Sequence, residues 1–400
     1  RSLLGLGAAD TTAADDLVDW LYGKDIGDVD GDTVTDESRE DMGDPLHSRP
    51  VTVIYGGTAA SPDIDDGAVY LTTNDGVLHA FNPVDGGEYW AFLPQNLVDR
   101  ARDLYTNDRT EPEDRDYGLD GTIRIVRTDV NRNGIVEPGD GDKVYLYFGQ
   151  RRGGNSYYGV DVSTKTAPQL MWAIHAADLP TEGQSWSSPA PGKVRIDTEE
   201  KQVLFVGGGY DVVQDQQPYT TDGNGAHVYM LDALTGALLW RAGNASDSGA
   251  NLQLADMTNS IVGDVRPIDM TGDGFADRLY AADLGGRIFR FDIYNGKTVS
   301  GSEGDRLVEG GLFASLGNAE DSPRDETNTL RFFFAPDPAL VTIEGQTIIN
   351  VAIGSGHREL PATDVTTQDW FFGVRDYHVF QQLLSSEYLA SCPSPATGPC

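Results

Sequence analysis

A short unit of strand, turn and strand recurs along this chain, and it constrains the fold more than any other feature. The turn begins with Asp or Asn and has Gly four residues later, and a Trp closes the next strand. Two copies match at all three positions: Asn82, Gly86 and Trp90 in one, Asp232, Gly236 and Trp240 in the other. Asp161 and Asp292 begin related units. Repeated units that bury their faces only against their neighbours are typical of propeller blades.

The spacing of these units predicts an irregular propeller. The four anchors, at positions 82, 161, 232 and 292, lie 79, 71 and 60 residues apart, more than the ~40–50 residues of common blades. Each blade must therefore carry insertions. The sequence predicts an all-β fold, a single β-propeller of about six to seven irregular blades with long insertions and one short N-terminal helix at 11–23. Further strands are predicted at Val144–Gly149, Val203–Gly208, Arg331–Phe334, Ile348–Ile353 and Trp370–Val374.

Three regions follow from this reading. Residues 1–41 hold the helix and an acidic loop that leads into the propeller, 42–390 form the propeller, and 391–400 form a tail. Cys392 and Cys400 bracket the Pro-rich tail and are the two cysteines of the sequence. Their short spacing favours a terminal disulfide and an oxidising compartment, and two free thiols are the alternative.

The charge balance indicates which partners to expect. The chain has 63 acidic and 29 basic residues, a formal charge of −34, which argues against nucleic acid because a phosphate backbone would be repelled. The acidity suits cations, and it is also what a saline habitat would favour. No apolar run approaches the ~20 residues of a membrane span, so we expect no direct membrane span.

The clearest candidate site is loop C, residues 269–277. Its ligand order is that of a Ca²⁺ loop, with oxygen side chains at positions one, three, five and nine and a Gly at position six, Gly274. The seventh residue would contribute its carbonyl oxygen. Position twelve is Tyr280 in a predicted strand, so the loop leads into a sheet and not a helix. A glycine-rich turn without metal is the alternative. The candidate ligands are Asp269, Thr271, Asp273, Phe275 and Asp277.

Two further loops have the same spacing. Loop A begins at position 28 and has Thr33 at position six, so a solvated acidic turn is the alternative; its candidate ligands are Asp28, Asp30, Asp32, Val34 and Asp36. Loop B begins at position 129 within a long insertion, has Gly134 at position six, and has an Asn-Gly turn as the alternative. Its two Asn ligands predict weaker binding. Its candidate ligands are Asp129, Asn131, Asn133, Ile135, Glu137 and Asp140.

Long segments resemble the C-terminal β-propeller of the PilC/PilY family, which are type IV pilus biogenesis factors and tip adhesins. The similarity extends over nearly all of residues 12–380. The matching segments are Met42–Pro50, Thr73–Phe81, Val144–Gly154, Tyr157–Asp161 and Asp269–Asp292.

The resemblance implies a protein exported through the periplasm to the cell surface, on the pilus. It implies that calcium in loop C regulates pilus extension and retraction, twitching motility and adhesion. The implied partners are pilus components such as minor pilins, and host or abiotic surfaces. Family members carry an adhesive N-terminal region, which we expect upstream of this chain. Some carry an Arg-Gly-Asp motif for integrins, which this sequence lacks.

The rival class is an enzyme, a quinoprotein dehydrogenase, whose propeller has similar Asp, Gly and Trp repeats and a catalytic calcium. Such enzymes hold their quinone against a disulfide of adjacent cysteines, whereas Cys392 and Cys400 are eight positions apart. The sequence contains no Gly-x-Ser-x-Gly, P-loop or His-Glu-x-x-His motif. His47 and His357 are interpreted as hydrogen-bonded structural residues. We therefore expect no enzymatic activity. A purely structural propeller that binds another protein is the third reading.

Overall fold

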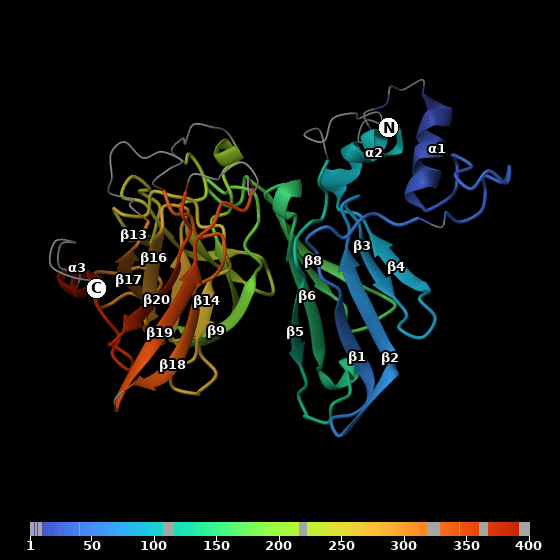
Figure 1. The fold of residues 1–400 in the computed structure, drawn as a ribbon. Coiled ribbons are helices and arrows are strands. Elements are labelled where there is room, and N and C mark those ends of the chain that lie inside the picture. The colour runs from blue at the N-terminus through green and yellow to red at the C-terminus, as the bar shows by residue number, and fades with distance from the viewer. Residues whose placement is uncertain are drawn as a thin grey trace.

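The computed structural model describes residues 4, 6, 10–39, 41–106, 116–215, 222–317, 329–343, 345–359 and 367–391. Its strands form five sheets (Figure 1). The first sheet contains β1 Val51–Thr58, β2 Ser61–Thr72, β3 Leu78–Phe81 and β4 Glu88–Phe92, and the second contains β5 Arg124–Thr128, β6 Lys143–Gly149, β7 Tyr157–Asp161 and β8 Gln169–Ile174. The third contains β9 Ala190–Ile196, β10 Glu199–Gly207, β11 Val228–Asp232, β12 Leu238–Gly243 and β13 Leu252–Gln253. The fourth contains β14 Arg266–Ile268, β15 Arg278–Ala282, β16 Arg287–Ile293 and β17 Val308–Ser315, and the fifth contains β18 Asp337–Ile343, β19 Gln346–Gly354 and β20 Phe371–Asp376.

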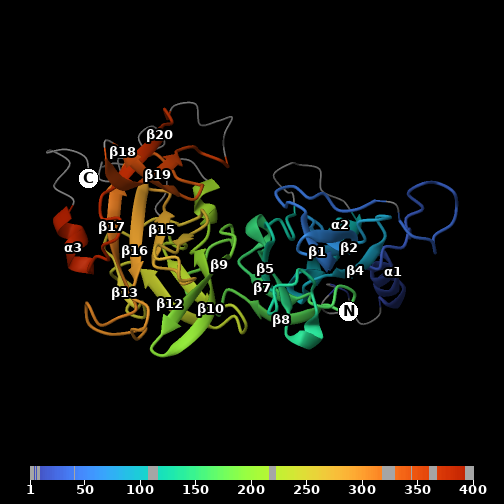
Figure 2. The same cartoon turned by 90° about the horizontal axis from the view of Figure 1, so that it is seen from below.

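The strands of each sheet follow one another in chain order. Neighbours are antiparallel, except that β13 runs parallel to β12. The first strands of the second, third and fourth sheets touch, β5 against β9 and β9 against β14. These first strands therefore lie toward the middle of the assembly, and later strands lie outward, as the view from below shows (Figure 2).

The recurring turn has the physical basis that its sequence suggests. In the first sheet the Asn82 carbonyl accepts the Gly86 amide at 3.0 Å, and the Asn82 side chain accepts the Val84 amide at 3.0 Å. In the third sheet Asp232 makes the equivalent bond to the Gly236 amide at 2.8 Å. Gly86 has φ +75°, a left-handed conformation that glycine adopts without a steric penalty.

The four largest hydrophobic cores of the described residues are each shared by two consecutive sheets. One cluster joins the first and second sheets, another the second and third, a third the third and fourth, and a fourth the fourth and fifth. Trp240 of β12 is fully buried and meets Phe291 of β16 edge-on, with ring centroids 5.9 Å apart. The sheets are therefore held side by side by their faces, as propeller blades are.

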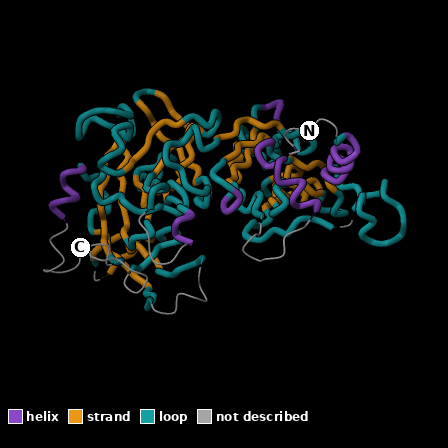
Figure 3. The backbone as a smooth tube through the Cα atoms, turned by 90° about the horizontal axis from the view of Figure 1, so that it is seen from above, coloured by secondary structure: helices purple, strands orange, loops and turns teal. Residues whose placement is uncertain are grey.

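Three short helices lie at the periphery (Figure 3). α1 (Thr11–Leu21) packs through Leu17 on α2 (Ala101–Thr106), and α3 (Ser385–Ser391) packs against β17 near the other end of the chain. Among the described helices, none is both long enough and apolar enough to cross a membrane.

The all-β class and the N-terminal helix at 11–23 are confirmed, with two differences. The described residues form five sheets, where six to seven blades were predicted. The predicted strand Arg331–Phe334 is wrong: it is an irregular segment, apolar because Phe332 and Phe333 are buried and not because it pairs in a sheet. Cys392, Cys400 and the predicted tail lie outside the described residues.

Candidate metal centres

Loop C joins β14 to β15 in the fourth sheet, and its first residue organises it. The Asp269 carboxylate accepts backbone amides from Gly272 at 2.6 Å and Gly274 at 2.7 Å. Partial desolvation would raise the pKa of Asp269, but these amides together hold it below its usual value. The loop is thus folded around an ionised carboxylate.

The later carboxylates of loop C bind nearby amides as well. Asp277 Oδ2 accepts the Met270 amide at 2.8 Å and the Thr271 amide at 3.0 Å. Asp273 Oδ1 accepts the Phe275 amide at 3.0 Å. These contacts bring the ends of the loop together, and no amide of the described residues donates to the second oxygen of Asp273 or of Asp277.

Loop B lies at the corresponding place in the second sheet, between β5 and β6. Asp129 Oδ2 accepts the Gly134 amide at 2.9 Å. Glu137 Oε2 accepts two hydrogen bonds, one from Asn133 Nδ2 at 2.6 Å and one from Asn131 Nδ2 at 3.4 Å. The structure therefore brings four of the predicted ligands of loop B together.

The predicted last ligand of loop B, Asp140, is not part of this arrangement. It lies exposed in the 3-10 turn η4 (Pro138–Asp140). Asp142, which the sequence analysis missed, is fully buried and closes the loop. Its carboxylate accepts the Val130 amide at 2.7 Å and the Glu137 amide at 3.0 Å, and these two bonds lower its pKa. An Asp directly before the second strand of a sheet is the signal that could have found it.

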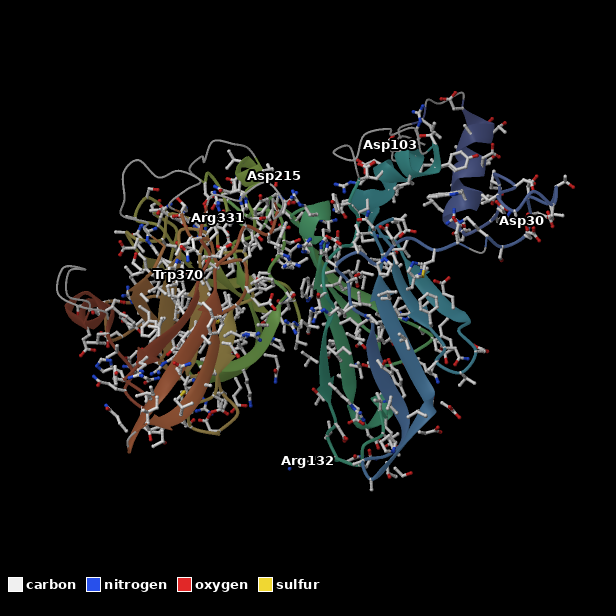
Figure 4. The ribbon with its side chains drawn as sticks, viewed as in Figure 1. Asp30, Asp103, Arg132, Asp215, Arg331 and Trp370 are labelled. Carbon is white, nitrogen blue, oxygen red and sulfur yellow. The ribbon has the colours of Figure 1, made fainter. Side chains whose placement is uncertain are left out.

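Loop A lies between α1 and β1, and it brings carboxylates closest together. Among the described His, Cys, Asp and Glu residues, three ligand atoms come within 4.8 Å of one another only here, in the groups Asp28, Asp30 and Asp32 and Asp25, Asp30 and Glu37. Asp30 is labelled in Figure 4, far out on the N-terminal side. Asp25 and Glu37 were not predicted, and exposed Asp36 belongs to neither group.

The crowding of negative charge in loop A shows in Glu37. Desolvation, followed by the charges of Asp32, Asp30 and Asp25, raises the pKa of this carboxyl. Like charges in one site disfavour ionisation of any one of them, and a cation would relieve that repulsion.

All three loops share a hydrogen-bond pattern and two left-handed positions. The first carboxylate of each accepts the amide of the sixth residue, which is Thr33, Gly134 or Gly274. That sixth residue has φ of +74°, +85° and +88° respectively, and the fourth residue is left-handed in each loop as well. The fifth side chain of each accepts the seventh amide, at 2.7, 2.8 and 3.0 Å. Those seventh residues are Val34, Ile135 and Phe275.

Loop C is attached to the neighbouring third sheet by the side chain of Phe275. This ring is buried between two cations of β9, the Lys193 ammonium and the Arg195 guanidinium, each 4.5 Å from its centroid. The Ala276 amide also donates to the Lys193 carbonyl at 2.8 Å. A change in the order of loop C would therefore reach β9.

The strand that follows loop C begins with a buried ionic network. Arg278 Nε lies 2.8 Å from Asp292, and Arg290 lies 2.9 Å from Asp292 and 2.7 Å from Asp376. Tyr388 of α3 donates to Asp292 at 2.6 Å. The network joins the fourth sheet to the last described segment of the chain.

Comparison with known sequences identifies the family. Residues 46–318 match the sequence model described as the PilY1 beta-propeller domain. The chain belongs to this family. The propeller and the PilC/PilY resemblance predicted from the sequence are thereby confirmed.

Known members of the PilY1 family are much longer. Type IV pilus biogenesis factor PilY1 of Pseudomonas aeruginosa PAO1 is 26% identical over 247 residues, which are 62% of this chain and 19% of that protein. A PilY1 homolog of Xylella fastidiosa is 25% identical over 271 residues, again 62% of this chain and 19% of that protein. The chain thus spans about a fifth of these relatives.

A solved structure from the PilY1 family has the same fold. The crystal structure of the Pseudomonas aeruginosa PilY1 C-terminal domain aligns with a TM-score of 0.50 at 21% identity, covering 78% of this chain and 57% of that one. Within this PilY1-type fold, His47 is hydrogen-bonded as the sequence analysis expected: its Nδ1 lies 2.8 Å from buried Asp120, which also pairs with Arg151 at 2.8 Å.

Proposed function

We propose that this chain is a calcium-binding propeller domain of a type IV pilus-associated protein, and that calcium ordering of loop C regulates pilus extension and retraction, twitching motility and adhesion. Its place would be the cell surface, on the pilus. Its partners would be minor pilins and host or abiotic surfaces, without nucleic acid, a direct membrane span or enzymatic activity. The names of the relatives, type IV pilus biogenesis factors, support the pilus context.

The threefold repeat of one loop geometry supports calcium. In each loop the donors at positions one, three, five and nine are oxygen groups, the ligands that Ca²⁺ prefers. The residues fit the ion because backbone amides hold the first carboxylate of each loop in place. In loop C, Asp273 and Asp277 each accept amides of the described residues through one oxygen, Oδ1 and Oδ2 respectively, so that the second oxygen of each could bind a cation. The ligands would be Asp269, Thr271, Asp273, Asp277 and the Phe275 carbonyl in loop C. In loop B they would be Asp129, Asn131, Asn133, Glu137 and the Ile135 carbonyl, with Asp142 closing the loop. In loop A they would be Asp28, Asp30, Asp32 and the Val34 carbonyl, with Asp25 and Glu37 beside them.

The connections of loop C support regulation. Without a cation its three carboxylates repel one another, and with Ca²⁺ they converge. Phe275 links that change to β9 of the third sheet, and Arg278 links it to the segment ending in α3. Calcium would shift loop C between a loose and an ordered state to the extent that it binds the ordered state more tightly.

Calcium titration by calorimetry tests the proposal. Asp273→Ala should lose one binding event, because the Asp273 carboxylate would supply a ligand, whereas among the described residues it is hydrogen-bonded only to the Phe275 amide. Asp85→Ala is a matched control: Asp85 is an exposed turn residue that makes the same bond to the amide two positions on, at 2.9 Å.

The two variants separate metal binding from turn stability. Equal calcium titrations of the wild type, Asp273→Ala and Asp85→Ala would refute a metal site in loop C. In cells, an Asp277→Ala variant should be exported normally and alter piliation or twitching. Lost calcium affinity with unchanged piliation and motility would refute the regulatory role and leave the binding site standing.

A further inference from the structure

A small aromatic and aliphatic cluster lies among the connections between strands. It consists of buried Trp186, Tyr210, Val262, Leu284 and Phe333, each from a connection between strands. We call this cluster the hub. Trp186 lies at its centre, with its ring centroid 4.8 Å from Tyr210 and 6.3 Å from Phe333. Connections from the second to the fifth sheets therefore converge on one indole.

Arginines gather around this indole, although the chain has a formal charge of −34. The guanidinium carbons of Arg151, Arg152 and Arg358 lie 3.8, 5.4 and 5.9 Å from the Trp186 ring centre. Asp215 and Arg331, labelled in Figure 4, mark this end of the molecule, opposite Arg132. Two of these guanidiniums are paired within the chain, Arg151 with Asp120 and Arg152 with Asp215. Among the described residues, Arg358 is the one of the three without a carboxylate partner.

Arg152 shows how this surface holds a carboxylate. Its two terminal nitrogens reach the two oxygens of Asp215 at 2.6 and 2.9 Å, and the Tyr210 hydroxyl donates to Asp215 at 2.8 Å. Such a two-point contact matches the planar guanidinium fork to the planar carboxylate. The hub therefore contains a built carboxylate site whose occupant is supplied by the chain itself.

Arg358 offers a second fork without such an occupant. Its side chain is exposed and stacks over Phe334, at 5.1 Å, and Trp186. Besides these ring contacts, Arg358 has an electrostatic repulsion with Arg151. Within the described ranges, its terminal nitrogens make no hydrogen bond. Stacking orients the plane of a guanidinium through its face, and the N–H donors at its edge stay available for hydrogen bonds.

The neighbouring carboxyl, Glu359, is not the partner of Arg358. Both of its oxygens are buried, and neither has a hydrogen-bond partner outside its own residue among the described part of the chain. Burial raises its pKa to about 7. Arg151, Arg152, Asp215 and Tyr210 are the charged and titratable groups around it. At neutral pH much of its negative charge is absent, which leaves the hub more cationic.

We propose that the hub is a docking point for an acidic segment of a partner protein, whose carboxylate is bound by the free fork of Arg358 over the rings of Trp186 and Phe334. Charge complementarity supports this occupant, since the guanidinium of Arg358 has no carboxylate partner among the described residues, whereas Arg151 and Arg152 are paired with Asp120 and Asp215. A polyanion such as nucleic acid would be repelled by the remainder of the surface. The inference does not depend on calcium.

Fluorescence polarisation with a labelled hexaglutamate peptide tests this, on the 400-residue chain in 150 mM NaCl with chelator. Arg358→Ala should weaken binding about tenfold or more, because a charge-assisted two-point contact is lost. Arg375→Ala is the matched control, an exposed arginine on β20 of the fifth sheet and outside the hub. Unlabelled hexaglutamate should displace the probe, and hexaglutamine should not.

Several outcomes would overturn the inference. These are no binding of the probe, equal weakening by Arg358→Ala and Arg375→Ala, and displacement by hexaglutamine. Displacement by millimolar phosphate as effective as that by hexaglutamate would assign the fork to free phosphate. A second readout is pH: affinity should fall as pH rises through about 7, because ionised Glu359 repels the peptide, and Glu359→Gln should flatten that fall. An undiminished fall in Glu359→Gln would contradict the role given to this carboxyl.

Discussion

Asp142 and Asp277 hold the same position in two different sheets. Asp142 Oδ1 accepts the amide of the second residue of loop B at 2.7 Å, and Asp277 Oδ2 accepts the amide of the second residue of loop C at 2.8 Å. Each is the last residue before the second strand of its sheet. The two loops are therefore variants of one structural unit, placed at equivalent positions in the second and fourth sheets.

Replacing Asp142 should destabilise the fold. In Asp142→Asn one of the two amides, of Val130 or Glu137, would face an NH₂ group and lose its acceptor. Hydrogen bonds to a charged group contribute about 1.5–3 kcal/mol, so we expect a loss of about 2 kcal/mol in urea unfolding. Asp140→Asn, two residues away and exposed, should change little. If Asp140→Asn lost more unfolding free energy than Asp142→Asn, Asp140 would be the residue that closes the loop.

Glycine at position 33 should make the protein more stable than the native threonine does. Its φ of +74° is left-handed, where a Cβ costs about 1–2 kcal/mol. Thr33→Gly should therefore raise the melting temperature, although glycine also gains entropy in the unfolded chain. Val34→Gly, at the next position, lacks left-handed strain and should lower it. A destabilised Thr33→Gly would show that the threonine side chain has a role of its own in loop A.

Glu182 should make stability depend on pH. This carboxyl is buried beside the Tyr157 phenol, and burial raises its pKa well above 4.5. Because the folded pKa is raised, its contribution is fully present below pH 4.5 and is lost as pH rises toward the folded value. Glu182→Gln should match the wild type at pH 4 and melt at a higher temperature at pH 7. Exposed Glu199→Gln serves as the control, and a difference that does not widen with pH would argue against a protonated Glu182.

Breaking the buried network should release the segment that ends in α3. Asp376 contacts Arg290 at 2.7 Å and Tyr280 at 2.5 Å. Removing one partner of a buried pair costs about 3–5 kcal/mol, so Asp376→Ala should unfold more easily and become sensitive to limited proteolysis after β20. Asp369→Ala, an exposed neighbour, should not. Unchanged proteolysis of Asp376→Ala would show that α3 is held independently.

Calcium should stabilise the chain if the loops bind it. Extracellular calcium modules have dissociation constants on the order of 10⁻⁴–10⁻³ M, and a ligand at 100-fold its dissociation constant adds about 2.7 kcal/mol. Chelator should therefore lower the melting temperature, most clearly when compared with several millimolar calcium. Identical melting curves in chelator and calcium would argue against a structural ion.

The sequence alone predicted the repeated turn and the position of all three loops, because local spacing determines both. Asp140 was predicted and Asp142 was missed because the twelve-residue template places its last ligand at position twelve, whereas here the closing carboxylate is the residue directly before strand β6. Asp25 and Glu37 lie outside that template and reach loop A only through folding. The segment 331–334 was read as a strand because burial in the hub and pairing in a sheet leave the same apolar pattern.

The sharing of each core by consecutive sheets has a consequence for how this chain reaches its native state. The largest cluster includes Val194 of the third sheet and Val308 of the fourth, so about a hundred residues must be present before it closes. During synthesis, which starts at the N-terminus, each sheet exposes one apolar face until the next sheet has been synthesised and packs on it. Folding should therefore follow the order of the sheets, and each sheet should complete its core only when the next sheet is available. The most recently synthesised sheet should remain accessible to chaperones.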